Sequence, residues 1–220
     1  NIATGNGLYT GPVQGQTGPG PFPVQSSTAH TVTAEDLAMQ KSVAPGTFVA
    51  GEIATYTLEL QVSEYVSASG IVITDLLPNG VCPVWSTQSP TVTGALPADC
   101  GTGGSPAGSD PTGATLSTVT GNSDGTFTLV FEPLAAAANG NITVTYQGRM
   151  RTEYTGGSLA GLPTSSGDTY TNTVSLAGTT DTRPDVNAPS PTGPLTVNDN
   201  SSATQSSTQP SIDKRIKPNV

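Results

Sequence analysis

A lysine occupies an apolar position in a run of alternating residues in the first third of the chain. Lys41 comes two and four residues after Met39 and Leu37, and Val43 continues the alternation. Residues two apart in a β-strand point to the same face of the sheet. Because lysine is almost never fully buried without a partner, this residue either reaches solvent at the strand end or meets a reactive or charged group inside the fold.

Two further polar residues have the same placement in later strand-like runs. Asp75 shares its parity with Ile71 and Ile73, and Asn172 shares its parity with Val174 and other apolar neighbours. Taken singly, the aspartate could begin the turn that follows it, and the asparagine could be a polar edge residue. Taken together, the pattern predicts a lysine, an aspartate and an asparagine that point into one core.

These residue types can form an amide bond. An apolar environment lowers the pKa of lysine and raises the pKa of aspartate, because it disfavours both charged forms. The neutral Lys41 amine is then a nucleophile, and protonated Asp75 can donate a hydrogen bond that polarises the Asn172 carboxamide. Attack expels ammonia, and proximity in a fold can lower such a barrier by roughly 7–11 kcal/mol. We therefore predict a Lys41–Asn172 isopeptide bond with Asp75 as the catalytic acid.

The elements that must position these side chains are strands. Turn residues separate six predicted strands, which cover 37–43, 52–63, 70–76, 126–132, 141–151 and 169–177. One helical turn is expected at 133–140, and residues 86–125 form a long polar insertion. This pattern predicts an all-β protein, an Ig-like antiparallel β-sandwich with extended linkers at both ends.

Composition excludes several classes of protein. Hydrophobic residues make up 34% of the 220 residues and charged residues 10%, and the net charge is −9. An acidic chain lacks the basic footprint of a nucleic-acid-binding protein, and no apolar run is long enough to insert this segment into a membrane. The single histidine, His30, lies in a predicted linker, so Ser-His-Asp chemistry has no base. We expect no turnover enzyme.

The two cysteines are interpreted as a loop staple. Cys82 and Cys100 flank a segment rich in Pro, Gly, Ser and Thr that contains no histidine. One such pair cannot supply a tetrahedral zinc site without other ligands. A disulfide closing a loop of this size stabilises by about 3 kcal/mol in the chain-entropy model. It also indicates an extracellular or cell-surface location.

The two ends of the chain resemble pieces of its centre. Residues 1–5 resemble 172–176, and 211–218 resemble 37–45, with the asparagines 171 and the lysines 173 positions apart. Near-equal offsets predict a tandem repeat. The expected organisation is the last strand of a preceding repeat (1–10), an extended linker (11–34), an Ig-like module (35–180), an extended linker (181–210) and the first strand of a following repeat (211–220).

This organisation implies partners for the end strands. Asn1 and Lys214 would form bonds with neighbouring modules, either along one polypeptide or between subunits of a polymer. Acidic and amide residues of the second linker could also offer oxygen ligands to calcium, although a solvated acidic linker is the simpler interpretation. These residues are Asp181, Asp185, Asn187, Asn198, Asp199 and Asn200. No other cofactor is expected.

The chain also resembles a known family. The resembling segments are Lys41, Gly51-Glu52-Ile53-Ala54-Thr55-Tyr56-Thr57-Leu58, Ile73-Thr74-Asp75-Leu76-Leu77-Pro78-Asn79-Gly80-Val81 and Tyr170-Thr171-Asn172-Thr173-Val174. They are similar to the CnaA-type, or fimbrial D2-type, isopeptide-forming Ig-like repeats of large bacterial surface proteins. The resemblance implies that Lys41 and Asn172 are bonded and that Asp75 is the catalytic acid. The cysteine-bearing insertion at 82–100 departs from the family pattern.

Together these features predict a structural repeat module of a bacterial cell-surface fibre or adhesin stalk, locked by its internal bond. Its partners would be neighbouring repeats or subunits of the same protein, with a host or surface receptor as a further candidate. The alternative is a ligand-binding adhesin module that presents the disulfide-stapled 82–125 loop to a receptor or glycan. That loop has no aromatic residue after position 85.

Overall fold

A computed structural model describes residues 2–9, 22–29, 36–181, 194 and 196–208. The chain divides into two units, Asn1–Glu35 and Asp36–Val220. In the first, β1 (Ile2–Tyr9) and β2 (Phe22–Ala29) form an antiparallel hairpin. The predicted linker over 11–34 is therefore wrong for residues 22–29, whose Pro, Gln and Ser content hides a strand that is held by backbone pairing. The assignment of residues 1–10 to a preceding repeat stays a prediction.

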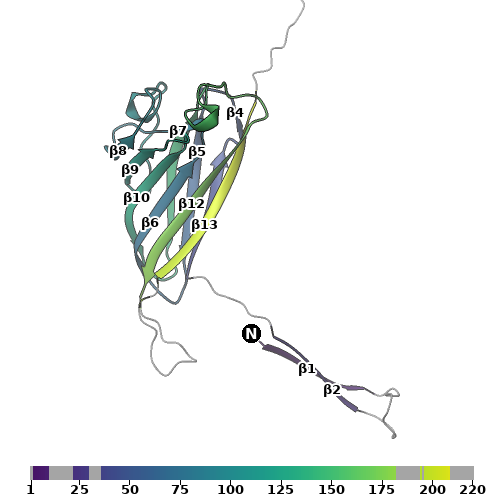
Figure 1. Cartoon of the computed structure of the whole chain (residues 1–220). Coiled ribbons are helices and arrows are strands. Elements are labelled where there is room, and N and C mark those ends of the chain that lie inside the picture. The colour runs from purple at the N-terminus through teal and green to yellow at the C-terminus, as the bar shows by residue number, and fades with distance from the viewer. Residues whose placement is uncertain (1, 10–21, 30–35, 182–193, 195, 209–220) are drawn as a thin grey trace, which may run out of the picture. The chain divides into compact units, whose positions relative to one another are not determined.

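The second unit is a sandwich of two β-sheets (Figure 1). One sheet has the order β4 (Thr47–Phe48), β13 (Thr196–Ser207), β12 (Thr169–Thr180), β6 (Ala68–Leu77), β10 (Phe127–Ala136), β9 (Leu116–Gly121) and β8 (Thr91–Gly94). The other has the order β3 (Leu37–Ala44), β5 (Ile53–Val62), β11 (Asn141–Met150) and β7 (Val81–Val84). Pairing is antiparallel except where β13 meets β4 and β9 meets β8. The predicted all-β sandwich is confirmed.

Alternating burial places the core between the two sheets. Every second residue of β12 from Tyr170 to Thr180 is buried, and β5 alternates in the same way from Ala54 to Val62. The strand period of two thus turns one face of each sheet inward. The six predicted strands match β3, β5, β6, β10, β11 and β12.

Two predictions about local structure are wrong. The expected helical turn at 133–140 does not form, because β10 continues to Ala136 and still pairs with β6 through register shifts after Phe131 and Leu134. The polar insertion at 86–125 is partly strand, since β8 and β9 extend the larger sheet beyond β10. Two 3₁₀ turns, η1 (Gly101–Gly103) and η2 (Gly157–Leu159), complete the unit.

The predicted linker at 181–210 is also wrong over β13, which pairs with β12 along almost its whole length (Figure 1). The strand is polar, but its side chains have partners. Asp199 Oδ2 accepts a hydrogen bond from the Met39 backbone N–H at 2.6 Å, and Ser201 Oγ accepts one from the Lys41 N–H at 3.1 Å. Gln205 is buried and donates to the Tyr56 hydroxyl. β13 therefore covers the side of the sandwich between β12 and β3. The predicted strand at 211–220 lies outside the described residues.

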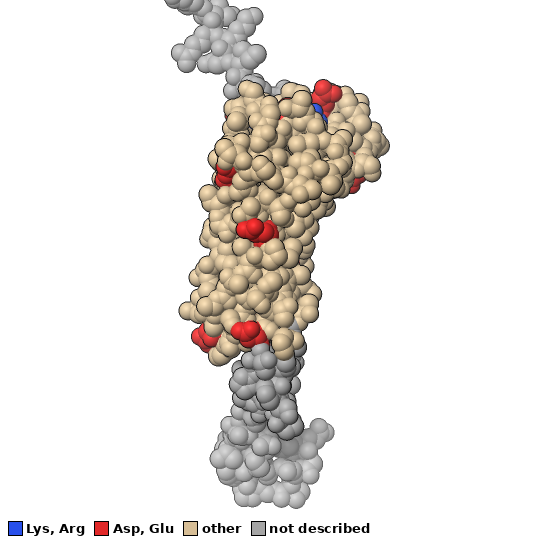
Figure 2. Space-filling model, turned by 90° about the vertical axis from the view of Figure 1, so that its left-hand side faces the viewer, with Lys and Arg blue, Asp and Glu red and all other residues tan. Residues whose placement is uncertain are grey.

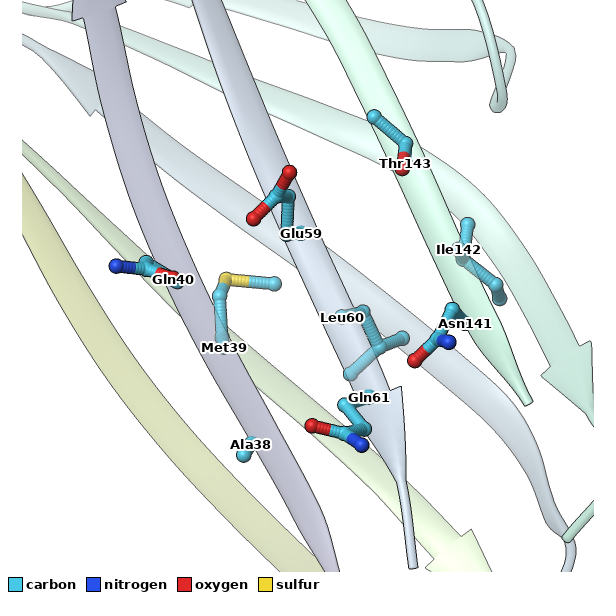
Figure 3. Close-up of a pocket in the computed structure, with 9 residues that line it drawn as sticks. All are labelled: Ala38, Met39, Gln40, Glu59, Leu60, Gln61, Asn141, Ile142 and Thr143. Carbon is cyan, nitrogen blue, oxygen red and sulfur yellow. The ribbon is translucent and has the colours of Figure 1, made fainter. Parts of the chain in front are cut away.

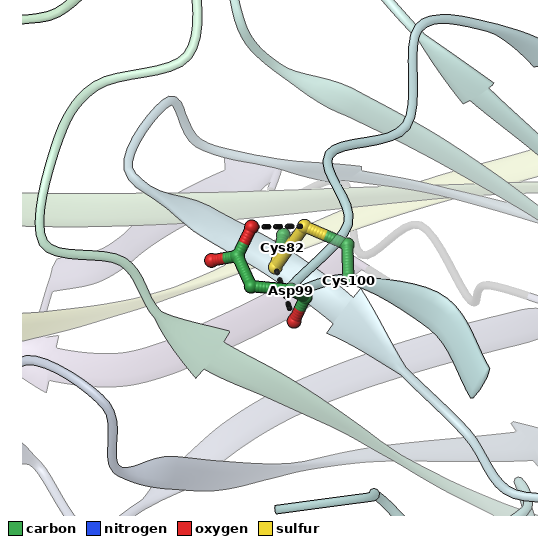
Figure 4. Close-up of side chains that lie close together, drawn as sticks. All are labelled: Cys82, Asp99 and Cys100. Carbon is green, nitrogen blue, oxygen red and sulfur yellow. Dashed lines mark hydrogen bonds between the residues drawn. A yellow bond between two sulfur atoms is a disulfide. The ribbon is translucent and has the colours of Figure 1, made fainter. Parts of the chain in front are cut away.

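The predicted disulfide is confirmed between Cys82, on β7, and Cys100, which precedes η1 (Figure 4). Both residues belong to the buried core. Buried Arg149 donates from Nη1 to the carbonyl oxygen of Asp99, next to the bridge. The staple and the arginine together hold the loop that ends at η1 against the smaller sheet.

Replacing Cys82 and Cys100 with alanine should lower the free energy of unfolding by about 3 kcal/mol, because the bridge closes a loop with a sequence separation of 18. Urea unfolding followed by fluorescence of the single, buried Trp85 measures this. A reductant should lower the stability of the wild type and leave the variant unchanged. Equal urea midpoints for the oxidised wild type and the variant would contradict a stabilising bridge.

Candidate functional site

Strands of both sheets bring the three predicted residues together in the core. Lys41 comes from β3 of the smaller sheet, and Asp75 and Asn172 come from the adjacent strands β6 and β12 of the larger sheet. The β6–β12 register places Asp75 opposite Val174, two residues from Asn172. Lys41 is 6% exposed, and Asp75 and Asn172 are fully buried. The end residues Asn1 and Lys214 lie outside the described residues.

A tyrosine hydroxyl links the lysine to the asparagine. Lys41 Nζ donates to Asp75 Oδ2 and, at 3.0 Å, to the hydroxyl oxygen of Tyr146. Asn172 Nδ2 donates to the same hydroxyl oxygen at 2.8 Å. Tyr146 lies on β11 opposite Tyr56 of β5, and their rings stack with centroids 5.0 Å apart. The amine and the carboxamide therefore converge on one oxygen atom inside an aromatic enclosure.

Burial pushes the lysine and the aspartate toward their neutral forms. Desolvation lowers the pKa of Lys41 and outweighs the attraction of Asp75, which acts in the opposite direction. Desolvation likewise raises the pKa of Asp75 against the attraction of Lys41. Both directions favour transfer of a proton from the amine to the carboxylate. Such a transfer would leave an uncharged amine with a free electron pair beside a carboxylic acid.

Two acceptors in this cluster have no hydrogen-bond partner. Asp75 Oδ1 and Asn172 Oδ1 are both buried and unpaired. A carboxylate can only accept a hydrogen bond, whereas a carboxylic acid also donates one. The Asn172 side chain lies close enough to Asp75 to lower the pKa of its carboxyl group. A proton on Asp75 would therefore place a donor near the asparagine carbonyl oxygen, and the same donor would activate the carbonyl group.

Sequence reasoning missed the aromatic members of the site. Tyr146 and Tyr56 share the parity of apolar core residues, so they read as packing residues in their strands. The available signal was chemical, since a buried tyrosine hydroxyl generally requires a hydrogen-bond partner. Desolvation, with Asp75 close by, raises the pKa of both phenols, so both keep their protons.

The described residues show no separate metal site. Their only group of three or more potential metal ligands is Cys82, Asp99 and Cys100, and its two sulfurs form the disulfide (Figure 4). In the proposed calcium set, Asp181 accepts a hydrogen bond from Ser67, and Asp199 accepts from backbone N–H groups. Asp185 and Asn187 lie outside the described residues. Calcium binding stays a prediction.

On the surface of the described residues, no comparable group of chemically reactive side chains is found. A groove on the smaller sheet is lined by uncharged polar and apolar side chains and one carboxylate, that of Glu59 (Figure 3). Figure 2 shows isolated acidic side chains on a largely uncharged face. In the part of the chain that the structure describes, no helix is long and apolar enough to cross a membrane.

The chain is similar to several solved structures. No protein-family model and no curated protein matches the chain. One similar solved structure is that of BcpA, the major pilin subunit of Bacillus cereus, with a TM-score of 0.36 and 11% identity. The match covers 87% of this chain and 52% of that chain, so this chain spans about half the length of the pilin. A likeness of this degree carries no argument about function, which must come from the geometry of the core.

The buried ion pair can be tested without the isopeptide bond in an Asn172→Ala background, where the bond cannot form. Adding Asp75→Ala should lower the free energy of unfolding by about 3–5 kcal/mol, because it leaves Lys41 buried without its partner. Replacing both partners, with Lys41→Met and Asp75→Leu, should restore stability to the background value or above it. Urea unfolding provides all three values. A loss below about 1 kcal/mol for Asp75→Ala would show that the pair is solvated.

Proposed function

We propose that this chain carries a structural module of a bacterial cell-surface fibre or adhesin stalk, locked by a self-catalysed isopeptide bond between Lys41 and Asn172. The observation that supports the proposal is a buried cluster in which the Lys41 amine donates to the Asp75 carboxylate and to the Tyr146 hydroxyl oxygen, to which the Asn172 carboxamide also donates. Such a group of polar side chains is unfavourable to bury without a role. The module would act outside the cell, with neighbouring repeats or subunits as its partners.

The reaction balances without any external reagent. Asp75 takes a proton from the Lys41 ammonium group and then donates a hydrogen bond to the Asn172 carbonyl oxygen. The electron pair of Lys41 Nζ forms a bond to Asn172 Cγ, and the Cγ–Nδ2 bond breaks. One proton leaves Nζ and one is gained by Nδ2, which departs as ammonia. The products are a neutral amide and protonated Asp75, so the module consumes its own side chains and does not turn over.

The position of the bond explains how it would bear load. β3 and β12 belong to different sheets and lie near opposite ends of the folded unit's sequence. An amide between them would carry tension directly from one strand to the other. The strands between them would stay folded, because their hydrogen bonds contribute only about 1 kcal/mol each and would no longer lie in the path of the force.

The alternative, an adhesin module presenting the 82–125 loop, gains no support from the structure. The loop is bound back onto the module, since Asp110 accepts hydrogen bonds from the backbone N–H groups of Ser86, Thr87 and Gln88. The Thr87 hydroxyl, which also donates to Asp110, and these backbone bonds lower the pKa of the Asp110 carboxyl group well below its ordinary value. Trp85 is buried, and a tethered loop with no aromatic side chain after position 85 is a weak candidate for recognition.

Intact mass provides the direct test. The denatured and reduced wild-type chain should be lighter than its sequence by one ammonia, and Lys41→Ala, Asp75→Ala and Asn172→Ala variants should have their full sequence masses. Trypsin does not cleave after an acylated lysine, so the wild-type digest should contain one branched peptide that joins the segments around Lys41 and Asn172.

The lysine variant is also the control for another route to the same mass change. The Asn79-Gly80 pair can lose ammonia by forming a succinimide, and Lys41→Ala leaves that pair intact. A loss of ammonia that persists in Lys41→Ala would assign it to such a side reaction. A wild type at full sequence mass would refute the cross-link.

A pulling experiment tests the mechanical role. Stretching the wild-type chain from its two ends should leave roughly 130 residues between Lys41 and Asn172 unextended. At the reach of an extended chain this removes about 450 Å from the contour length. Under reducing conditions, which also open the Cys82–Cys100 bridge, the Asn172→Ala variant should recover that length. Equal extension of the two proteins would contradict a load-bearing bond.

A further inference from the structure

We infer that Tyr146 is a catalytic residue of bond formation, whose hydroxyl group passes a proton from the attacking Lys41 nitrogen to the departing Asn172 nitrogen. This inference rests on the proposed function and adds to it a residue that the sequence pattern of lysine, aspartate and asparagine does not contain. It starts from a geometric fact. The hydroxyl oxygen is 3.0 Å from Lys41 Nζ and 2.8 Å from Asn172 Nδ2, so it touches both reacting nitrogen atoms.

The hydrogen-bonding capacity of a phenol fits this position. A tyrosine hydroxyl can accept from two donors while it donates its own hydrogen to a third group. Here it accepts from the lysine and from the asparagine. Asp75 lies close enough to raise the pKa of the phenol. Tyr146 thus contacts the nucleophile and the leaving group, and it lies near the acid.

The reaction contains a proton transfer that Asp75 does not accomplish while it activates the carbonyl group. When Asp75 donates its proton to the Asn172 carbonyl oxygen, that proton polarises the carbon and is not on the leaving nitrogen. The amide nitrogen must still be protonated, because an amide anion is a very poor leaving group. The attacking nitrogen must lose a proton at the same stage, since bond formation gives it a positive charge.

Tyr146 meets both requirements, the protonation of Asn172 Nδ2 and the deprotonation of Lys41 Nζ. Its hydroxyl gives a proton to Asn172 Nδ2 as the Cγ–Nδ2 bond breaks, and it takes a proton from Lys41 Nζ as the new bond forms. The phenol is unchanged at the end, the new amide keeps one N–H, and ammonia carries away the transferred proton. No oxidant, metal or external base enters the balance.

The surroundings favour transfer through the phenol over transfer through water. Tyr146 is 2% exposed, and its ring stacks on Tyr56 and lies against Phe131. The raised pKa keeps the hydroxyl protonated, so it can donate before it accepts. A fixed donor in a desolvated site needs no reorganisation when the charge develops.

Tyr56 provides a matched control. Its ring centroid is 5.3 Å from Lys41 Nζ, against 5.4 Å for Tyr146, so the two rings offer the amine nearly the same aromatic contact. Asn172 lies close enough to lower the pKa of the Tyr56 phenol, but the Tyr56 hydroxyl accepts its hydrogen bond from Gln205. Among the hydrogen bonds of the described residues, those of Lys41 Nζ go to Asp75 and Tyr146.

The test compares Tyr146→Phe with Tyr56→Phe, because each substitution removes one oxygen atom from the same stacked pair. Full-length chains are made by cell-free synthesis, synthesis is stopped, and aliquots are denatured in acid at successive times. The fraction lighter by one ammonia gives the rate of bond formation. We expect Tyr146→Phe to slow this rate on the order of 10²-fold or more, as is typical for loss of a general acid–base group. Tyr56→Phe should stay within a few-fold of the wild type.

Folding is checked on the same samples by the fluorescence of buried Trp85, which neither substitution removes, and by formation of the Cys82–Cys100 bridge. Both phenylalanine variants should give the wild-type result, because the rings and their packing are retained. A Tyr146→Phe chain that folds and reacts at the wild-type rate overturns the role of Tyr146 and leaves the isopeptide bond standing. Equal slowing in both variants also overturns it, since the effect would then come from packing. A wild type that never loses ammonia refutes the proposed function itself.

Discussion

The desolvated amine of Lys41 is the constraint on which the rest of the module depends. An isolated buried ammonium is far too costly to keep charged, so the core must pair it, neutralise it or consume it. Asp75 pairs with the amine, and the tyrosine rings and hydroxyl enclose it. These groups come from strands of both sheets, so the lysine can be accommodated only when the sandwich is fully assembled. Local structure in any single strand would leave it exposed.

The registers of the paired strands fix the positions of the residues around Lys41. A slip of one residue would turn each of these side chains to the opposite face of its sheet. The β5–β11 register sets Tyr56 opposite Tyr146. The β6–β12 register sets Asp75 opposite Val174, which is two residues from Asn172. Continuous apolar alternation on both sides of each polar residue fixes these registers, since a slipped strand would expose its whole apolar set. The apolar residues thus fix the positions of the polar residues that lie among them.

The same hydrophobic pattern explains which parts of the fold and of the site could be predicted from the sequence. Lys41, Asp75 and Asn172 were conspicuous because charged or amide groups break an apolar series, and the six strands that carry that series were predicted well. Tyr146 was not conspicuous because its ring continues the series and only its hydroxyl does chemistry. β13 was hidden for a different reason. Polar residues predominate on both of its faces, with Val197 and Ala203 as the apolar exceptions. Individual hydrogen bonds of Asp199, Ser201 and Gln205 help to fix its place, and no periodicity reveals them. The parallel pairing of β8 with β9 likewise depends on contacts that are distant in sequence.

A polar strand beside a reactive core has a physical rationale. β3 would otherwise present unpaired N–H groups at the edge of the smaller sheet, and such an edge can pair with other chains. The Asp199 and Ser201 side chains accept hydrogen bonds from the N–H groups of Met39 and Lys41, so these two edge donors are not free to pair with another chain. Exclusion of water strengthens each interaction within the site and favours the neutral amine. Amide formation would then remove the buried charge that imposed this arrangement, because its product contains a neutral amide and a protonated carboxyl group. Before reaction the buried pair would contribute little to stability, whereas afterwards the same residues would hold the two sheets together covalently.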